Sequence, residues 1–168
     1  DLTVECDGAG NGADLDAWLA SNGGASATDA CSGVTWSNDF EALSADCGAT
    51  GAATVTFTAT DDCGNATSTM ATFTIEDTTA PSATVEPQFD LACAEYDPNA
   101  IYGAVFADDC SGDVTVTFVD APGAGGCLNI NQSWYIRTYT VTDACGNETT
   151  EQQQLHLIDD IAPVVTIE

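Results

Sequence analysis

The sequence predicts an all-β fold of two tandem two-sheet sandwich units with short helical inserts, stapled by disulfide bonds. Apolar residues alternate with threonine in several segments, which is the pattern of half-buried strands. A block of sequence returns 82 residues later without a gap. Eight cysteines, four in each copy of this repeat, lack the spacing of metal ligands and therefore indicate disulfide bonds.

The repeat is clearest around its cysteines. The segment "TDDCGN" at 60–65 returns as "TDACGN" at 142–147, and related segments are "TDACSG" at 28–33 and "ADDCSG" at 107–112. In chain order the matching cysteines are Cys6 and Cys93, Cys31 and Cys110, Cys47 and Cys127, and Cys63 and Cys145. We therefore expect one unit over residues 1–80, a second over 81–163, and the start of a following strand or repeat over 164–168.

Strands are predicted in order along each unit. In the first unit we expect strands within 33–40, 53–62 and 70–77, with Phe57 and Phe73 on the buried face. The second unit repeats the pattern with three expected strands, whose buried positions include Tyr139, Val141, Leu155 and Leu157.

The last two strands of each unit form a hairpin around its "CGN" turn. Gly64 and Gly146 suit a positive φ there, and Asp61 and Asp143 are placed to accept hydrogen bonds from turn amides.

Two short helical inserts interrupt the β pattern. In the first unit Asp14 is a candidate N-cap and Gly23 a stop signal, with Leu15, Trp18 and Leu19 on one face. In the second unit Asp97 is a candidate N-cap, followed by Pro98 at the first helical position. We expect one helical turn near the start of each unit.

Charge limits the classes of partner. The chain has 27 Asp and Glu residues against one Arg and no Lys, so its formal charge is −26. Such a surface repels nucleic acid and anionic lipid, and favours divalent cations or basic partners. No apolar stretch reaches the ~18 residues that would span a bilayer. We expect no nucleic-acid binding and no membrane insertion, and the disulfides predict an extracellular or cell-surface location.

Single residues give no catalytic pattern. His156 has the strand parity opposite to Leu155 and Leu157, which predicts an exposed residue, and no nucleophile motif accompanies it. Arg137 shares the parity of Tyr139, which predicts an inner or rim position paired with a carboxylate. Trp18, Trp36 and Trp134 fall on different elements and are expected to pack in cores. The chain is not expected to be an enzyme.

The series "DACSG", "VTW", "TVTFTATDDCGN" and "ATFTIEDTTAP" resembles the hyalin-repeat-like (HYR-like) immunoglobulin-like modules of large Bacteroidota cell-surface and gliding adhesins. The resemblance covers both units, although "DDIAP" replaces "DTTAP" in the second. It implies immunoglobulin-like sandwiches and an exported stalk or adhesive repeat.

The resemblance also implies a disulfide pattern. In an immunoglobulin-like sandwich the turns that carry Cys31 and Cys63 lie at the same end, which implies the bonds Cys31–Cys63 and Cys110–Cys145, and leaves Cys6–Cys47 and Cys93–Cys127. Sequential pairing, Cys6–Cys31 with Cys47–Cys63, is an alternative. Loop-closure entropy gives about 3 to 4 kcal/mol per bond in both patterns and does not choose between them.

Acidic residues beside these turns suggest a metal site. Asp77, Asp108, Asp109 and Asp143 would offer hard oxygen ligands of the kind that suits Ca²⁺ if they converge. The alternative is that they only bond turn amides, so the cofactor prediction is none or calcium. Thr78, in "DTT", is a weak O-glycosylation candidate.

The functional prediction is a structural or adhesive repeat unit of an extracellular bacterial surface protein or filament, a stiff spacer with or without calcium. Its partners would be neighbouring repeats of the same chain or copies of itself. Two alternatives stay open: a subunit of a self-polymerising fibre that assembles by strand complementation, and a module that binds surface carbohydrates or proteins.

Overall fold

The computed structural model describes residues 1–122, 132–159 and 161–166, and the chain forms two compact β units. Unit 1 consists of Asp1–Thr79 together with Asp108–Asp113, and unit 2 of Ala80–Ala107 and Val114–Glu168. The second sequence repeat therefore contributes one short segment to unit 1. Residues 161–166 have no regular secondary structure.

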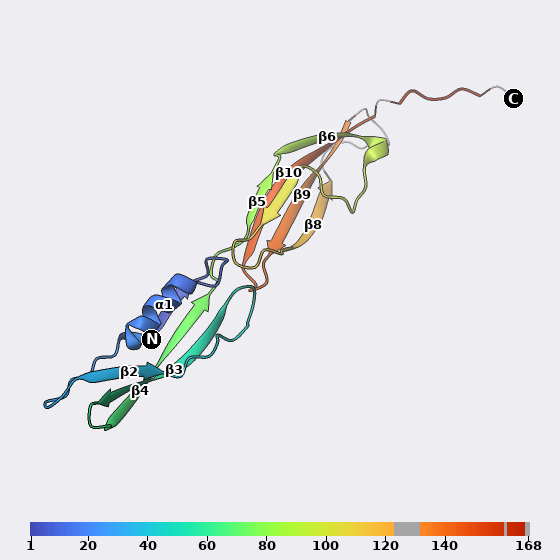
Figure 1. Cartoon of the computed structure of the whole chain (residues 1–168). Helices are drawn as coiled ribbons and strands as arrows, with labels where there is room; N and C mark the ends of the chain where they lie inside the picture. The colour runs from blue at the N-terminus through green and yellow to red at the C-terminus, as the bar shows by residue number, and fades with distance from the viewer. Residues whose placement is uncertain (123–131, 160, 167–168) are drawn as a thin grey trace. The chain divides into compact units, whose positions relative to one another are not determined.

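Unit 1 is built on one four-stranded sheet with the order β1-β4-β3-β2 (Figure 1). Its strands are β1 (Leu2–Glu5), β2 (Val34–Asn38), β3 (Gly51–Asp61) and β4 (Ala66–Glu76). β3 pairs antiparallel with both β2 and β4, whereas β1 pairs parallel with β4. The strands predicted within 33–40, 53–62 and 70–77 are confirmed.

Alternation along β3 and β4 forms the core of unit 1. Val55, Phe57, Phe73 and Ile75 are almost fully buried. The helix α1 (Gly12–Ala20) covers this face through Trp18, whose ring lies 5.3 Å from that of Phe57 and 5.5 Å from that of Phe73. The strands of unit 1 form a single sheet. The helix α1 therefore covers the face that a second sheet would cover in a complete sandwich.

The helix boundary differs from the prediction. Asn11, with φ 50°, is the N-cap residue of α1, and Asp14 lies in the first turn instead of capping it. The Asn11 side chain bonds the Glu5 carbonyl and the Asp14 carboxylate at 2.8 and 3.2 Å. The α-helix ends at Ala20 and a 3₁₀ turn, η1 (Asn22–Gly24), follows it, with Gly23 at φ 64°.

Unit 2 contains two sheets. The larger has the order β6-β10-β9-β8, and the smaller pairs β5 with β7. The elements are β5 (Ser82–Val85), β6 (Gln88–Ala92), η2 (Cys93–Glu95), β7 (Ala104–Ala107), β8 (Thr115–Pro122), β9 (Gln132–Thr142) and β10 (Glu148–Ile158). Phe106 of β7 packs on Tyr139 of β9 with ring centroids 5.3 Å apart, which closes the sandwich.

The predicted inward residues of unit 2 are confirmed, but its helical insert is not. Tyr139, Val141, Leu155 and Leu157 are almost fully buried. Residues 97–103 form no helix, because the Asp97 carboxylate accepts the amide of Asn99 at 2.8 Å in a turn. A 3₁₀ turn lies just upstream, at η2.

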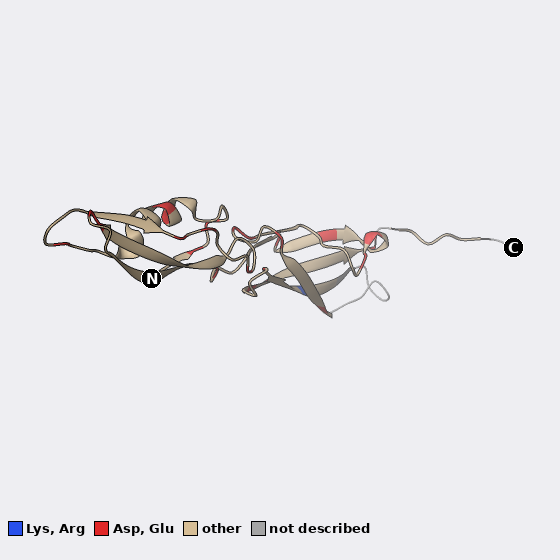
Figure 2. Ribbon diagram, turned by 60° about the horizontal axis from the view of Figure 1, so that its bottom comes forward, with Lys and Arg blue, Asp and Glu red and all other residues tan. Residues whose placement is uncertain are grey.

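The fold class is all-β, as predicted, with acidic residues distributed over both units (Figure 2). Within the described residues, no helix has the length and apolar character needed to cross a membrane.

Candidate functional site: the cysteine turns

The turns at Asp29–Gly33 and Asp108–Gly112 have the same hydrogen bonds. One oxygen of Asp29 accepts the amides of Cys31 and Ser32 at 2.8 and 2.9 Å, and also the Ser32 hydroxyl. One oxygen of Asp108 accepts the equivalent groups of Cys110 and Ser111, the two amides at 3.0 and 2.6 Å. The repeated aspartate therefore holds each cysteine amide in the same way.

The two hairpin turns also match each other. Asp61 accepts the amides of Cys63 and Asn65 at 2.9 and 2.8 Å, and Asp143 accepts those of Cys145 and Asn147 at 2.8 and 2.9 Å. Gly64 and Gly146 have φ values of 87° and 93°. The predicted role of the aspartates as acceptors of turn amides is confirmed.

These hydrogen bonds favour the ionised carboxylates. Bonds from the side chain and then the amide of Asn65 lower the pKa of Asp61, and bonds from the Cys31 and Ser32 amides lower that of Asp29. Burial acts to raise the pKa of Asp108, but bonds from Ser111 and Cys110 outweigh it and lower the pKa.

The cysteines on these turns differ in their bonding. Cys110 forms a disulfide with Cys6, with Cα atoms 5.6 Å apart. Cys47, Cys93 and Cys145 are also disulfide-bonded, whereas Cys31 and Cys63 are exposed free thiols. The predicted bonds Cys6–Cys47 and Cys110–Cys145 are therefore wrong. The predicted bond Cys93–Cys127 falls partly outside the described residues, since Cys127 lies in the gap.

The physical reason for Cys6–Cys110 is the way the segment Asp108–Asp113 packs in unit 1. A Cβ on Gly8 would lie 2.1 Å from the carbonyl oxygen of Asp109, and one on Gly48 would lie 3.0 Å from Cα of Ser111. Gly8, two residues after Cys6, and Gly48, directly after Cys47, thus let the backbone of this segment approach closely. The expectation that each repeat closes its own disulfide bonds is therefore wrong, because Cys6 and Cys110 belong to different repeats.

The expectation that the Cys31 and Cys63 turns face each other is correct. The Gly33 amide donates to the Asp62 carboxylate and the Asp62 amide donates to the Ser32 hydroxyl, both at 3.4 Å. The predicted Cys31–Cys63 bond is nevertheless absent. Beside the turns is an open hollow of about 190 Å³, lined in part by Asp29, Val34, Asp61 and Asn65.

The four aspartates of the calcium hypothesis are divided between the units. Asp77 and Asp108 belong to unit 1 and have carboxylate oxygens within 4.8 Å of each other. Asp109 is exposed in the same segment, and Asp143 belongs to unit 2. Two carboxylates alone fall short of the six to eight oxygen ligands that Ca²⁺ takes. Calcium binding by the four residues stays a prediction.

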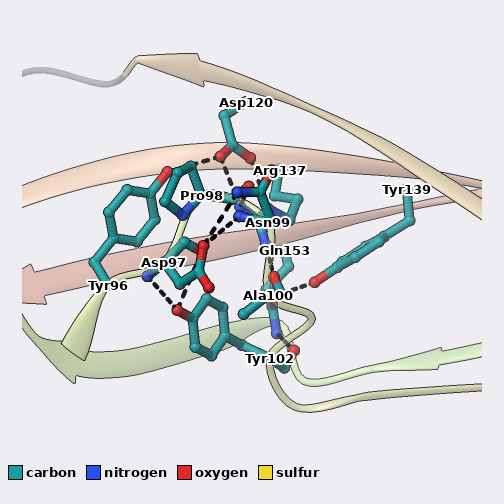
Figure 3. Close-up of polar contacts among 10 residues, drawn as sticks. All are labelled: Tyr96, Asp97, Pro98, Asn99, Ala100, Tyr102, Asp120, Arg137, Tyr139 and Gln153. Carbon is teal, nitrogen blue, oxygen red and sulfur yellow. Dashed lines mark hydrogen bonds and ion pairs between the residues drawn. The ribbon is translucent and has the colours of Figure 1, made fainter.

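A second polar cluster surrounds Arg137 in unit 2 (Figure 3). Arg137 is fully buried, and its Nε and one terminal nitrogen each donate to a different oxygen of Asp120 at 2.7 Å. The other terminal nitrogen donates to the Ala100 carbonyl. The guanidinium also lies 3.9 Å from the ring centroid of Phe118. Arg137 was predicted at an inner or rim position with a carboxylate partner; the structure has it at the inner position, paired with Asp120.

Tyrosines connect this cluster to the loop 96–102. The Tyr96 hydroxyl donates to Asp120 at 3.0 Å, and the Tyr102 hydroxyl accepts the amide of Asp97 at 2.6 Å. Hydrogen bonds from Arg137 lower the pKa of Asp120, and burial together with Asp120 raises the pKa of Tyr96 to about 12. The guanidinium connects Asp120 of β8 to the carbonyls of Pro98 and Ala100, so the cluster is suited to fixing this loop.

Three other predicted residues have simpler surroundings. The Thr78 hydroxyl donates to Glu5 at 2.9 Å and the residue is exposed, so its glycosylation stays a prediction. His156 is partly exposed, with Nδ1 3.2 Å from Asp90. Trp18 lies in the core as predicted.

Sequence reasoning missed Gly8, Tyr96 and Asp120. The Asp-Gly pair directly after Cys6 signals a tight turn, but it does not reveal what approaches that turn. The aromatic residues in "EYDPNAIYG" indicate an apolar segment, but their partners lie on distant strands.

No protein-family model matches the chain, and no curated protein sequence does. Among solved structures it is similar to a protocadherin gammaB7 EC3-6 cis-dimer, with 15% identity over 76% of this chain and 41% of that chain (TM-score 0.36). It is also similar to protocadherin gamma B2 extracellular cadherin domains 3-6 (17% identity, 66% and 33% coverage, TM-score 0.40) and to Drosophila N-cadherin EC1-4 (13%, 79% and 42%, TM-score 0.36). The chain spans less than half the length of each of these structures.

Proposed function

We propose that the chain is a structural repeat unit of an extracellular surface protein, in which disulfide-bonded β units act as spacers. The observation that carries the proposal is the recurrence of the same cysteine turns in both sequence repeats, with Cys110 of one bonded to Cys6 of the other within unit 1. Structural disulfides persist in oxidising compartments outside the cytoplasm. The resemblance to hyalin-repeat-like modules of Bacteroidota adhesins supports the same function.

Surface chemistry also supports a spacer. The net charge of −26 makes copies of the chain repel one another and keeps them soluble. The only cationic side chain besides His156 is that of Arg137, which is fully buried. The folded protein therefore offers trypsin no accessible cleavage site, a useful property for a protein outside the cell.

Sedimentation velocity and glycan-array binding of the oxidised chain, after trypsin treatment, test the proposal together. A spacer is expected to remain one intact, monodisperse species that binds no glycan. Urea should then permit cleavage after Arg137, which shows that the protease was active. Cleavage of the native chain, or saturable glycan binding that a denatured sample lacks, would contradict the spacer function.

A second candidate function rests on the segment after β10. Ile161, Val164 and Val165 are 65%, 88% and 85% exposed in a stretch without secondary structure. An exposed β-branched segment suits strand addition to another copy, the step by which a self-polymerising fibre would grow. Filaments of the pure protein in electron micrographs, abolished by Val164→Asp, would favour the fibre; monomers at high concentration would exclude it.

A further inference from the structure

We propose that Cys31 forms a disulfide bond with the cysteine at the position of Cys6 in a second copy of the first repeat, as Cys110 does with Cys6 in this chain. The proposal rests on the spacer function and deepens it by naming the partner and the bond. Its starting point is the unequal bonding of equivalent residues: Cys110 is bonded and Cys31 is an exposed thiol.

Cys31 and Cys110 are equivalent in sequence and in local structure. Both follow an aspartate by two residues and precede Ser-Gly. In both turns one carboxylate oxygen accepts the cysteine amide, the serine amide and the serine hydroxyl. The two thiols are therefore held by the same backbone arrangement. The Cys31 turn is thus suited to the contact that the Cys110 turn makes with Cys6.

The hairpin turns show the same inequality. Cys63 is a free exposed thiol, whereas Cys145, on a turn with the same hydrogen bonds, is disulfide-bonded. Both cysteines at one end of unit 1 thus lack the bonds that their equivalents have. The hollow beside them, lined partly by Asp29 and Asn65, leaves room for another segment to approach.

The structure also indicates which kind of repeat is the partner. The turn of Cys110 packs against the backbone at Gly8 and Gly48, where a side chain would collide. With the offset of the Cys6 and Cys93 pair, the residue equivalent to Gly8 in the second repeat is Glu95, which lies in η2. A partner that reproduces the observed contact must therefore carry a glycine two residues after its cysteine, as the first repeat does at Cys6 and Gly8.

The bond requires an oxidant. The Cys31 thiol and the partner thiol lose two protons and two electrons as the S–S bond forms, and a low-molecular-weight disulfide such as oxidised glutathione accepts them and becomes two thiols. An oxidising extracellular medium supplies this class of reagent.

The test uses the full chain with a copy of residues 1–81 added ahead of Asp1. In the added copy Cys31→Ser and Cys63→Ser remove its own exposed thiols. After oxidation in glutathione buffer, free thiols are alkylated, and an aspartate-directed protease yields peptides for mass spectrometry. We expect a peptide in which Cys6 of the added copy is linked to Cys31 of the original chain, together with a near-complete loss of Cys31 alkylation. In the unextended chain, Cys31 should alkylate fully.

The matched control is the same extended chain with Cys6→Ser in the added copy. Cys31 alkylation should return, and the Cys6–Cys110 peptide should persist in both chains, which shows that they fold. The proposal is overturned if Cys31 remains alkylated in the extended chain, or if it links to Cys63 instead. Filaments or glycan binding would overturn the spacer function without changing this readout, so the two failures are distinguishable.

Discussion

At the scale of single residues, Arg137 is the one charged side chain that is completely buried in the part of the chain that the structure describes. Replacing it with Met leaves the Asp120 carboxylate without its bidentate partner, and breaking a buried ion pair in this way costs about 3–5 kcal/mol. Arg137→Lys keeps the charge but loses the paired geometry, so its loss should be smaller. Urea unfolding of both variants measures the difference; equal stability of Arg137→Met and the unaltered chain would contradict the structural role.

The hydrogen bond between Tyr96 and Asp120 predicts a loss of stability in alkali. The pKa of Tyr96 is raised from 10.0 to about 12, so its contribution is complete below pH 10 and is lost as the pH rises toward 12. The pKa of Asp120 is lowered, so its contribution is present above pH ~4 and is lost as the pH falls through the lowered value.

Melting temperature measured across pH checks the first expectation. Tyr96→Phe should flatten the alkaline fall, whereas Tyr135→Phe, which removes a stacked ring's hydroxyl, should retain it. A fall of the same size in Tyr96→Phe would assign the effect to other groups.

Strand parity predicted an inner or rim position for Arg137, and turn chemistry predicted the role of the turn aspartates. Both could be predicted because they depend on a few neighbouring residues. Asp120 and Tyr96 could not be assigned as partners, since they lie 17 and 41 positions away and meet Arg137 only through the paired strands and the loop.

At the scale of elements, the segment Asp108–Asp113 depends on close backbone approach. Gly8→Ala would place Cβ 2.1 Å from the Asp109 carbonyl oxygen, whereas Cβ at Gly10 would meet nothing within 4 Å, and both glycines have positive φ. Both variants share the backbone strain of about 1 kcal/mol. We expect Gly8→Ala to be the less stable in thermal unfolding and to slow formation of the Cys6–Cys110 bond; equal behaviour would contradict the packing.

The long strands were predictable because alternation is a local signal that repeats over many residues, as in β3 and β10. The boundary of α1 was not, since the capping residue Asn11 is held by Asp7 and Glu5 and adopts a left-handed conformation. The disulfide partner of Cys6 could not be predicted for a similar reason. Loop-closure entropy changes slowly with loop length, so only tertiary packing selects Cys110.

At the scale of the whole molecule, the charge of −26 predicts sensitivity to divalent cations. Calcium at a hundred times its dissociation constant would add about 2.7 kcal/mol of stability, which raises the melting temperature by several degrees. Asp77→Asn should abolish this rise if the predicted site binds the ion. Asp16→Asn makes the same charge change at an exposed position of α1 and should retain the rise in melting temperature. Calorimetry of chelated samples with and without calcium decides, and no rise in any sample would leave turn bonding as the role of the acids.

The Cys6–Cys110 bond also determines how the chain carries a pulling load. Tension applied at its two ends has a direct covalent path through the bond between Cys6 and Cys110, which bypasses the backbone between these two residues, 104 positions apart. If fully extended, the chain between these two cysteines would have a contour length of roughly 350 Å. A reductant would release this length under tension, so the redox state of the surroundings would set how far such a repeat can stretch before it fails.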